Sequence, residues 1–91
     1  MKFTLSQLEA VVWAVRLGSF RAAAHRLNIT QPAISVRMRE LEQAFGEPLF
    51  ERDSYRARPT AAGRRLAWEA ERVLEHAEVL DRRLADRDLL F

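Results

Sequence analysis

The segment 19–45 constrains the fold more than any other part of the chain, because it holds the start and stop signals of two consecutive helices. Ser19 is a good N-cap for a short first helix, and Asn28 tolerates the left-handed backbone conformation that ends one. Thr30 is a second N-cap, and Pro32 fits the first turn of the following helix, where no backbone N–H is needed. Two helices joined by a turn of about three residues are therefore predicted, which is the pattern of a helix-turn-helix motif.

The second of these helices, predicted over about 31–45, has one apolar and one polar face. The apolar residues step by four, three and four positions, so they share one side of an α-helix and require a core. They are Ile34, Met38, Leu41 and Phe45. The opposite face has no acidic residue in its first two turns, and a helix of this kind can contact phosphates and base edges in the major groove of DNA. The candidate base-edge contacts are Gln31, Pro32, Ser35, Val36 and Arg39. An ordinary solvated helix surface is the alternative.

Apolar residues before this motif are expected to complete its core. Thr4 and Gln7 match a capping box and Gly18 is a C-terminal cap, so another helix is predicted between them. The core-facing residues expected in this helix and the next are Leu5, Leu8, Val11, Val12, Val15, Leu17, Phe20, Ala23, Ala24 and Leu27, with Arg21, His25 and Arg26 facing outward. Trp13 lies off the apolar stripe and is expected to pack against a neighbouring element, either the last helix or a partner subunit.

Residues 51–59 combine turn-forming residues with arginines. Asp53 and Ser54 favour a turn, so the segment predicts a short two-stranded hairpin. A basic hairpin beside a helix-turn-helix is a wing, which contacts the DNA backbone or the minor groove, whereas an exposed solvated loop is the alternative. The candidates for phosphate or minor-groove contact across the chain are Ser19, Arg21, Thr30, Arg37, Arg52, Arg56 and Arg58.

The last helix is predicted to begin after Thr60 and to run to about Arg87, because only Gly63 interrupts it and no Pro does. At ~1.5 Å per residue it would be about 40 Å long, which is more than a small core can cover. Apolar residues follow a heptad pattern along it and charged residues flank them, so the helix is expected to pair with its twin in a second subunit. This seam consists of Leu66, Ala70, Val73, Ala77, Leu80 and Leu84. A single helix held by charge pairs four residues apart is the alternative.

The composition argues against several other classes of protein. With 91 residues, 48% of them hydrophobic and 31% charged, the chain suits one small globular domain. There is no Cys, His25 and His76 stand apart, and no set of catalytic groups appears, so we expect no metal, no cofactor and no enzymatic activity. No apolar run approaches the ~20 residues of a membrane span, so we expect a cytoplasmic protein without membrane contact.

Charge is unevenly distributed along the chain. The net charge is +2, and residues 1–60 carry Lys2 and eight Arg against six acids, whereas residues 61–91 carry six Arg against seven acids. The basic residues are almost all arginines, whose planar guanidinium group binds phosphate and guanine in a forked geometry. This arginine content is compatible with nucleic-acid binding, and an ordinary solvated surface is the alternative.

Together these residues resemble the N-terminal domain of LysR-type transcriptional regulators. The resemblance covers about residues 3–85 and rests on the joint spacing of Leu5-x-x-Leu8, Gly18-Ser19-Phe20, Ala23-Ala24, Leu27, Gln31-Pro32-Ala33-x-Ser35, Leu41-Glu42, Gly46, Leu49-Phe50-x-Arg52 and Thr60-x-x-Gly63. It implies groove contacts by Gln31, Pro32, Ser35 and Val36, and backbone or minor-groove contacts by Arg52 and the hairpin arginines. Val36 departs from the family, which often has Arg there, and Val can touch a thymine methyl but cannot hydrogen-bond guanine.

The resemblance also implies a linker helix that pairs antiparallel with its twin. An effector-binding domain that the 91 residues do not include would follow it, a small-molecule effector would act only through that domain, and a full-length protein would be a tetramer. We therefore predict an all-α fold with a small β wing, divided into a winged helix-turn-helix at 1–59 and a linker helix with the start of a hinge at 60–91. The predicted function is binding of pseudo-palindromic double-stranded DNA by a homodimer, and a coiled-coil adapter for protein interactions is the alternative.

Overall fold

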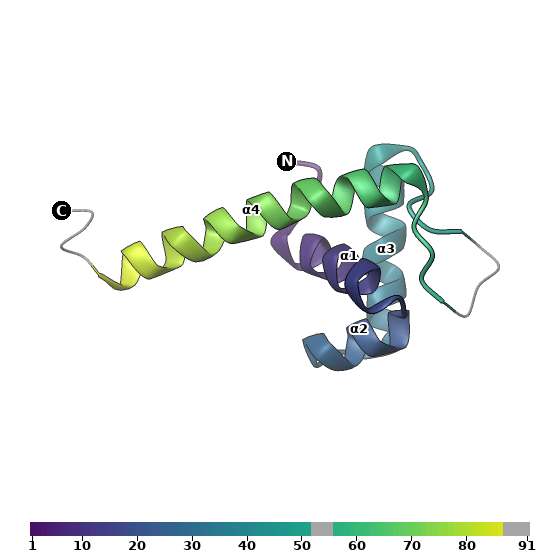
Figure 1. The fold of residues 1–91 in the computed structure, drawn as a ribbon, viewed down its shortest axis with the longest axis horizontal. Coiled ribbons are helices and arrows are strands. Elements are labelled where there is room, and N and C mark those ends of the chain that lie inside the picture. The colour runs from purple at the N-terminus through teal and green to yellow at the C-terminus, as the bar shows by residue number, and fades with distance from the viewer. Residues whose placement is uncertain (52–55, 87–91) are drawn as a thin grey trace.

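Four helices follow one another in the computed structural model, which describes residues 1–51 and 56–86 (Figure 1). They are α1 (Leu5–Leu17), α2 (Phe20–Leu27), α3 (Gln31–Phe45) and α4 (Ala61–Ala85). The mostly helical architecture with a helix-turn-helix is therefore confirmed, and α2 and α3 are its two helices. The last helix ends at Ala85, slightly before the predicted end near residue 87.

A hydroxyl group caps the start of every helix. The side chains of Thr4, Ser19, Thr30 and Thr60 each accept a hydrogen bond from the backbone N–H three residues further on, at 3.0–3.2 Å. The first three helices end at residues in the left-handed conformation, namely Gly18, Asn28 and Gly46. These caps satisfy backbone groups that a helix leaves unpaired at its ends, which explains why the predicted boundaries agree with the structure.

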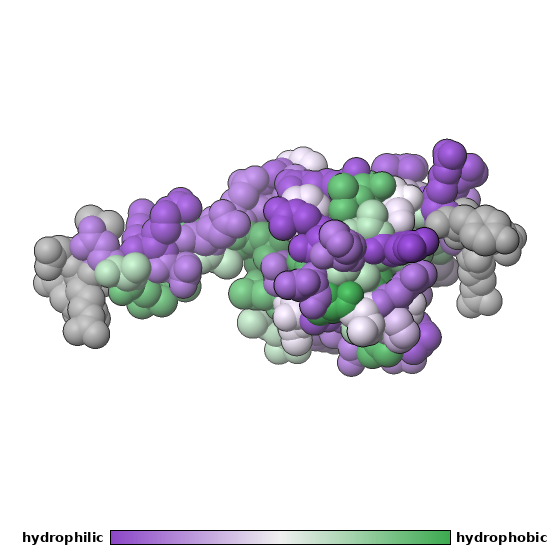
Figure 2. Space-filling model, turned by 90° about the horizontal axis from the view of Figure 1, so that it is seen from below, coloured by the Kyte–Doolittle hydropathy of each residue, from purple (hydrophilic) through white to green (hydrophobic). Residues whose placement is uncertain are grey.

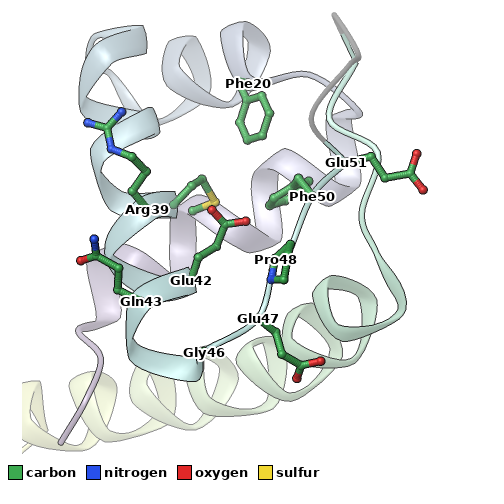
Figure 3. Close-up of a pocket in the computed structure, with 10 residues that line it drawn as sticks. Phe20, Arg39, Glu42, Gln43, Gly46, Glu47, Pro48, Phe50 and Glu51 are labelled. Atoms are coloured by element: carbon green, nitrogen blue, oxygen red, sulfur yellow. The ribbon is translucent and has the colours of Figure 1, made fainter.

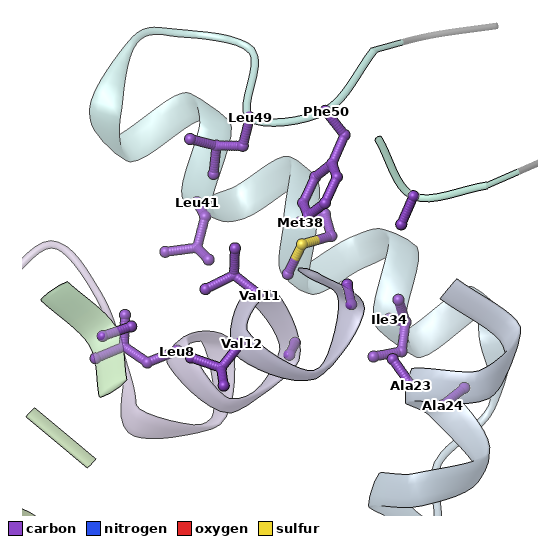
Figure 4. Packing of buried hydrophobic residues seen from close by; sticks show 14 residues of the cluster. Leu8, Val11, Val12, Ala23, Ala24, Ile34, Met38, Leu41, Leu49 and Phe50 are labelled. Atoms are coloured by element: carbon purple, nitrogen blue, oxygen red, sulfur yellow. The ribbon is translucent and has the colours of Figure 1, made fainter. Parts of the chain in front are cut away.

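Helix α1 lies in the middle of the fold and contacts each of the other three helices (Figure 1). Its buried side chains include Leu8, Val11 and Val12, and Val11 points toward Leu41 of α3 (Figure 4). Ala23 and Ala24 of α2 are also buried, and their small side chains let that helix approach closely. Because α1 contacts α2, α3 and α4, the position of the helix-turn-helix relative to α4 depends on the packing of both against α1.

Three residues predicted to face the core do not, because each lies at the end of a helix, beyond the width of the core. Leu5 is 48% exposed in the first turn of α1, Leu17 is 43% exposed in its last turn, and Phe45 is 44% exposed at the last position of α3. Val15, Phe20 and Leu27 are partly buried against the core, as predicted. Arg21, His25 and Arg26 are exposed, also as predicted.

Trp13 packs partly buried against the core, and its ring faces a neighbouring helix. The guanidinium group of Arg26, on α2, lies 4.2 Å from the ring centroid, and that of Arg16 lies 5.2 Å from it. Cations over the face of an indole ring are attracted by its quadrupole. The expected packing role is confirmed, but the closest cation over the ring comes from α2 and not from the predicted neighbours, the last helix or a partner subunit.

The predicted hairpin is represented in the described residues by a single antiparallel bridge between Phe50 and Pro59 and by no strand, so the small β wing is not confirmed. The N–H of Glu51 donates to the carbonyl of Arg58 at 2.9 Å. Pro59 has no N–H and cannot continue such a ladder, which limits the pairing at this end. Arg52, Asp53 and Ser54 lie outside the described residues. We call residues 47–51 and 56–59 the wing base.

The wing base packs tightly on the start of α4. The hydroxyl of Thr60 donates to the carbonyl of Pro48 at 2.8 Å, and the N–H of Thr60 donates to the carbonyl of Leu49 at 3.0 Å. One turn on, a Cβ atom at Gly63 would overlap the Leu49 carbonyl group. Only glycine therefore allows this close approach of two backbones.

The first half of α4 covers α1. Ala67 and Ala70 are buried, Leu66 and Leu74 are partly buried against the core, and the Nε of Arg16 donates to Oε1 of Glu71 at 3.1 Å. Two members of the predicted seam, Leu66 and Ala70, thus pack against the core of their own chain. The rest of α4 projects away from the other helices (Figure 1), and the molecule is 51 Å long but only 26 × 18 Å across.

The contact at Gly63 generates a prediction about stability. Gly63→Ala is expected to lower the free energy of unfolding by about 3 kcal/mol, because the added methyl group meets a backbone carbonyl that no side-chain rotation can move away. Gly46→Ala is the control, since its Cβ would meet open space and only the left-handed backbone is penalised, by about 1 kcal/mol. Urea denaturation measures both. Equal stability of Gly63→Ala and the parent protein would contradict the close packing.

Candidate nucleic-acid interface

The turn between α2 and α3 fixes the direction in which α3 leaves the core. Asn28 adopts φ 62°, and its N–H donates to the carbonyl of His25 at 3.2 Å. The N–H of Ile29 donates to the carbonyl of Ala24 at 3.0 Å, which tightens the same turn, and Thr30 then caps α3. The first turn of α3 is therefore held rigidly at the surface.

The base-edge candidates come together on one exposed face of α3. Gln31, Pro32, Val36 and Arg39 are exposed and Ser35 is partly buried beside them, whereas Ile34 and Met38 on the other side are buried. Val36 is 43% exposed, although it is apolar. A packing role against another helix would bury this side chain, so its exposure favours a role at the surface.

Arg37 lies apart from this face. Its Nη1 atom donates to the carbonyl of Ser6, in α1, at 3.4 Å, and the residue is partly buried. Helical geometry explains the difference, because position 37 lies about 160° around α3 from positions 35 and 39. The guanidinium group of Arg37 thus joins two helices of the fold in this structure.

The phosphate candidates surround the exposed face in three groups. Ser19 and Thr30 accept capping hydrogen bonds at the starts of α2 and α3, and each hydroxyl can still donate its proton. Arg21 is exposed in the first turn of α2. Arg56 and Arg58 are exposed on the wing base, and Arg52 lies outside the described residues.

A hollow of about 520 Å³ separates α3 from the wing base (Figure 3). Arg39, Glu42 and Gln43 line it from α3, and Glu42 points across it toward Pro48. On its floor the rings of Phe20 and Phe50 meet edge to face with centroids 4.9 Å apart. The exposed face of α3 and the wing base therefore form two separate walls of one surface.

Glu42 is a positioning residue that the sequence analysis missed. Its Oε2 atom accepts a hydrogen bond from the backbone N–H of Leu49 at 2.8 Å, so it ties the segment after α3 to α3 itself. The bond crosses the end of a helix, and hydrophobic periodicity carries no signal for such a contact. Because this carboxylate points inward, it adds no acid to the outer face of α3.

Two other kinds of site have no support in the described parts of the chain. No helix there is long and apolar enough to cross a membrane. Across residues 1–51 and 56–86, no group of three or more His, Cys, Asp or Glu side chains could hold a metal ion.

Comparisons with known proteins point to one family. The family model of bacterial regulatory helix-turn-helix proteins, lysR family, matches residues 5–64. The HTH-type transcriptional regulator CbbR of Xanthobacter flavus is 39% identical over 83 residues, which is 91% of this chain and 25% of that protein. A probable RuBisCO transcriptional regulator of Emiliania huxleyi is 41% identical over 78 residues, which is 86% of this chain and 25% of that protein.

Solved structures agree with these sequence matches. A CbnR_DBD–DNA complex superposes with a TM-score of 0.86 at 32% identity, over 94% of this chain and 99% of that chain. A Corynebacterium glutamicum OxyR C206 mutant gives a TM-score of 0.87 at 31% identity, over 94% of this chain and 28% of that chain. The chain thus spans about a quarter of the length of the curated relatives that it matches.

Proposed function

Because the chain belongs to the LysR family of bacterial regulatory helix-turn-helix proteins, we propose that it binds duplex DNA sequence-specifically as the DNA-binding part of a transcriptional regulator. The observation that carries the proposal is the exposed, acid-free start of α3, where the base-edge candidates share one face. The similar fold of CbnR_DBD, solved as a DNA complex, supports the same use of this surface.

In the proposed complex, the start of α3 enters the major groove. Gln31 can donate to and accept from an adenine edge, and Arg39 can bind guanine or a phosphate. Ser35 contributes a short hydroxyl, and Pro32 and Val36 contribute apolar contacts. Each good bidentate pair contributes roughly 1–3 kcal/mol of discrimination, so this face determines the sequence preference.

Contacts to the backbone then set the register of α3 on the duplex. Arg21 at the start of α2 and Arg56 and Arg58 on the wing base would neutralise phosphates on either side of the groove, with the hydroxyls of Ser19 and Thr30 as weaker donors. Arg52 belongs to the same proposal on sequence grounds. Arg37 is a weaker candidate, because its guanidinium group already bonds to α1.

The projecting half of α4 supports a homodimer. Val73, Leu80 and Leu84 are 38%, 50% and 57% exposed, and Figure 2 shows hydrophobic surface on the projecting end among hydrophilic side chains. Pairing with a second α4 would cover these side chains, and Ala77 lies between them on the same stripe. In this proposal residues 1–59 contact two DNA half-sites and residues 60–91 fix the spacing between the half-sites. Both segments contribute residues to one hydrophobic core.

Further properties belong to the full-length protein. The match covers only 25% of the relative CbbR, so we infer that effector binding and tetramer assembly depend on a domain outside the 91 residues. A small-molecule effector would act through that domain. Cytoplasmic localisation follows from the proposed contact with bacterial DNA.

Salt dependence separates DNA binding from the alternative, a coiled-coil adapter that docks another protein. Each phosphate contact contributes about 0.9 to the slope of log affinity against log salt, so three contacts predict a roughly 40-fold loss of affinity between about 50 and 200 mM salt. Fluorescence anisotropy with a labelled duplex measures this. Absence of binding to every duplex tested would favour the adapter.

Val36→Arg tests the proposed groove contact. The substitution is expected to shift the preference toward guanine at one position of each half-site, because Arg can bind guanine O6 and N7 and Val cannot. Selection of fragments from a random DNA pool measures the preference, and thermal melting serves as the control for folding. An unchanged preference with a lowered melting temperature would place Val36 in a packing role.

Leu80→Glu tests the proposed dimer. A carboxylate in the middle of the seam should yield a monomer with an intact helix-turn-helix, and DNA affinity should fall because two linked half-site contacts reinforce each other. Arg82→Glu is the matched control, since it places the same group on the opposite, exposed side of α4. Sedimentation that finds the same dimer in both variants would locate the interface elsewhere.

A further inference from the structure

Three arginines from two elements surround a shallow hollow of about 440 Å³ beside the wing base. Arg56 and Arg58 come from the wing base, and Arg64 comes from the first turn of α4. Glu51 is the acidic side chain among the lining residues, and Gly18, Ala57 and Pro59 complete the lining. The described lining therefore carries a net positive charge of two.

The backbone around this hollow is firmly held. The N–H of Ala57 donates to the carbonyl of Gly18, in the turn between α1 and α2, at 3.0 Å, and the Ala57 side chain is 3% exposed. The Glu51 N–H bond to the Arg58 carbonyl closes the other side, at 2.9 Å. The two arginines that flank Ala57 thus project from a fixed backbone.

Arg64 is oriented by the same wing base. Its Nη1 atom donates to the carbonyl of Pro59 at 3.3 Å, and the side chain is exposed. A guanidinium group has five N–H donors, so one bond to a carbonyl leaves most of them for another acceptor. The bond orients the group beside the hollow without neutralising its charge.

We propose that this hollow is a DNA-phosphate site in which Arg64 of α4 acts together with Arg56 and Arg58. The proposal rests on the proposed DNA-binding function and extends the interface beyond the helix-turn-helix and the wing to the long helix. Phosphate fits because guanidinium groups bind its oxygens in a forked geometry, and Arg58 and Arg64 line the hollow as exposed side chains.

The position of the hollow indicates which phosphate it holds. Glu51 lines both this hollow and the one that separates α3 from the wing base, so the wing base stands between the two. The arginine hollow therefore lies across the wing base from the exposed face of α3. A phosphate held there belongs to the backbone that flanks the base pairs contacted by α3.

The test compares Arg64→Gln with Arg65→Gln in the 91-residue chain. Both remove one exposed charge near the start of α4, but Arg65 lines a different groove, beside Phe45. Arg64→Gln is expected to lower the salt slope by about 0.9 and to weaken binding roughly eightfold at about 0.1 M salt, equally for all duplex sequences. Arg65→Gln should keep the slope of the parent protein, and Arg64→Lys should keep most of it because the charge remains.

A second experiment changes the length of the DNA duplex and measures the salt slope again. Duplexes shortened step by step at the flank should bind the parent protein with a slope lowered by the same amount once the flanking phosphate is lost, and Arg64→Gln should then cause no further change. A merely structural role for Arg64 would lower the melting temperature and leave the slope intact, because the slope counts the ions released by the folded complex.

The outcomes separate this inference from the proposed function. A steep slope for the parent protein that is identical in Arg64→Gln overturns the phosphate site and leaves DNA binding in place. Equal losses of slope in Arg64→Gln and Arg65→Gln overturn it too, since they would reflect total charge. A parent protein without salt-dependent duplex binding contradicts the proposed function itself.

Discussion

The backbone of Leu49 is the point at which the functional parts of this molecule are joined. Its N–H donates to Glu42 of α3, its carbonyl accepts from Thr60 at the start of α4, and its side chain is 1% exposed in the core. Gly63 allows α4 to pass directly over that carbonyl. The direction of the wing base relative to α3 therefore depends on a few backbone contacts and not on a β-sheet. A protein that contacts DNA with both elements needs such rigidity, because misplacement of either one loses the contacts of the other.

Several arginines make contacts within the fold. Arg16 pairs with Glu71, Arg26 lies over the ring of Trp13, and Arg37 bonds to the carbonyl of Ser6. These contacts join helices, and as exposed pairs they each contribute little to stability. The chain thus uses arginine for two purposes. The arginines named above make contacts between α1 and its neighbouring helices. The arginines of the wing base, such as Arg58, remain exposed toward the proposed duplex.

Local signals in the sequence were enough for the helices but not for contacts between them. The N-caps and the left-handed caps are short-range interactions, so Thr30 and its counterparts could be found from residue types alone. The burial of a side chain depends on which other helix packs against its face. The heptad pattern of α4 does not reveal that α1 packs against the face that holds Ala70. For the same reason Phe45 was expected in the core, and the roles of Glu42 and Arg64, which depend on long-range bonds to backbone atoms, were not anticipated. The exposed face of α3 could be predicted because helical periodicity alone defines it.

In the proposed complex the start of α3 and the wing base contact DNA together, whereas the projecting half of α4 does not. Backbone amide NMR shifts of the ¹⁵N-labelled chain, recorded while a duplex selected from a random pool is added, test it most directly. We expect the largest shift changes at residues 30–39 and 56–58, with residues 75–85 unchanged. Changes confined to residues 75–85, or none at saturating duplex, would contradict it.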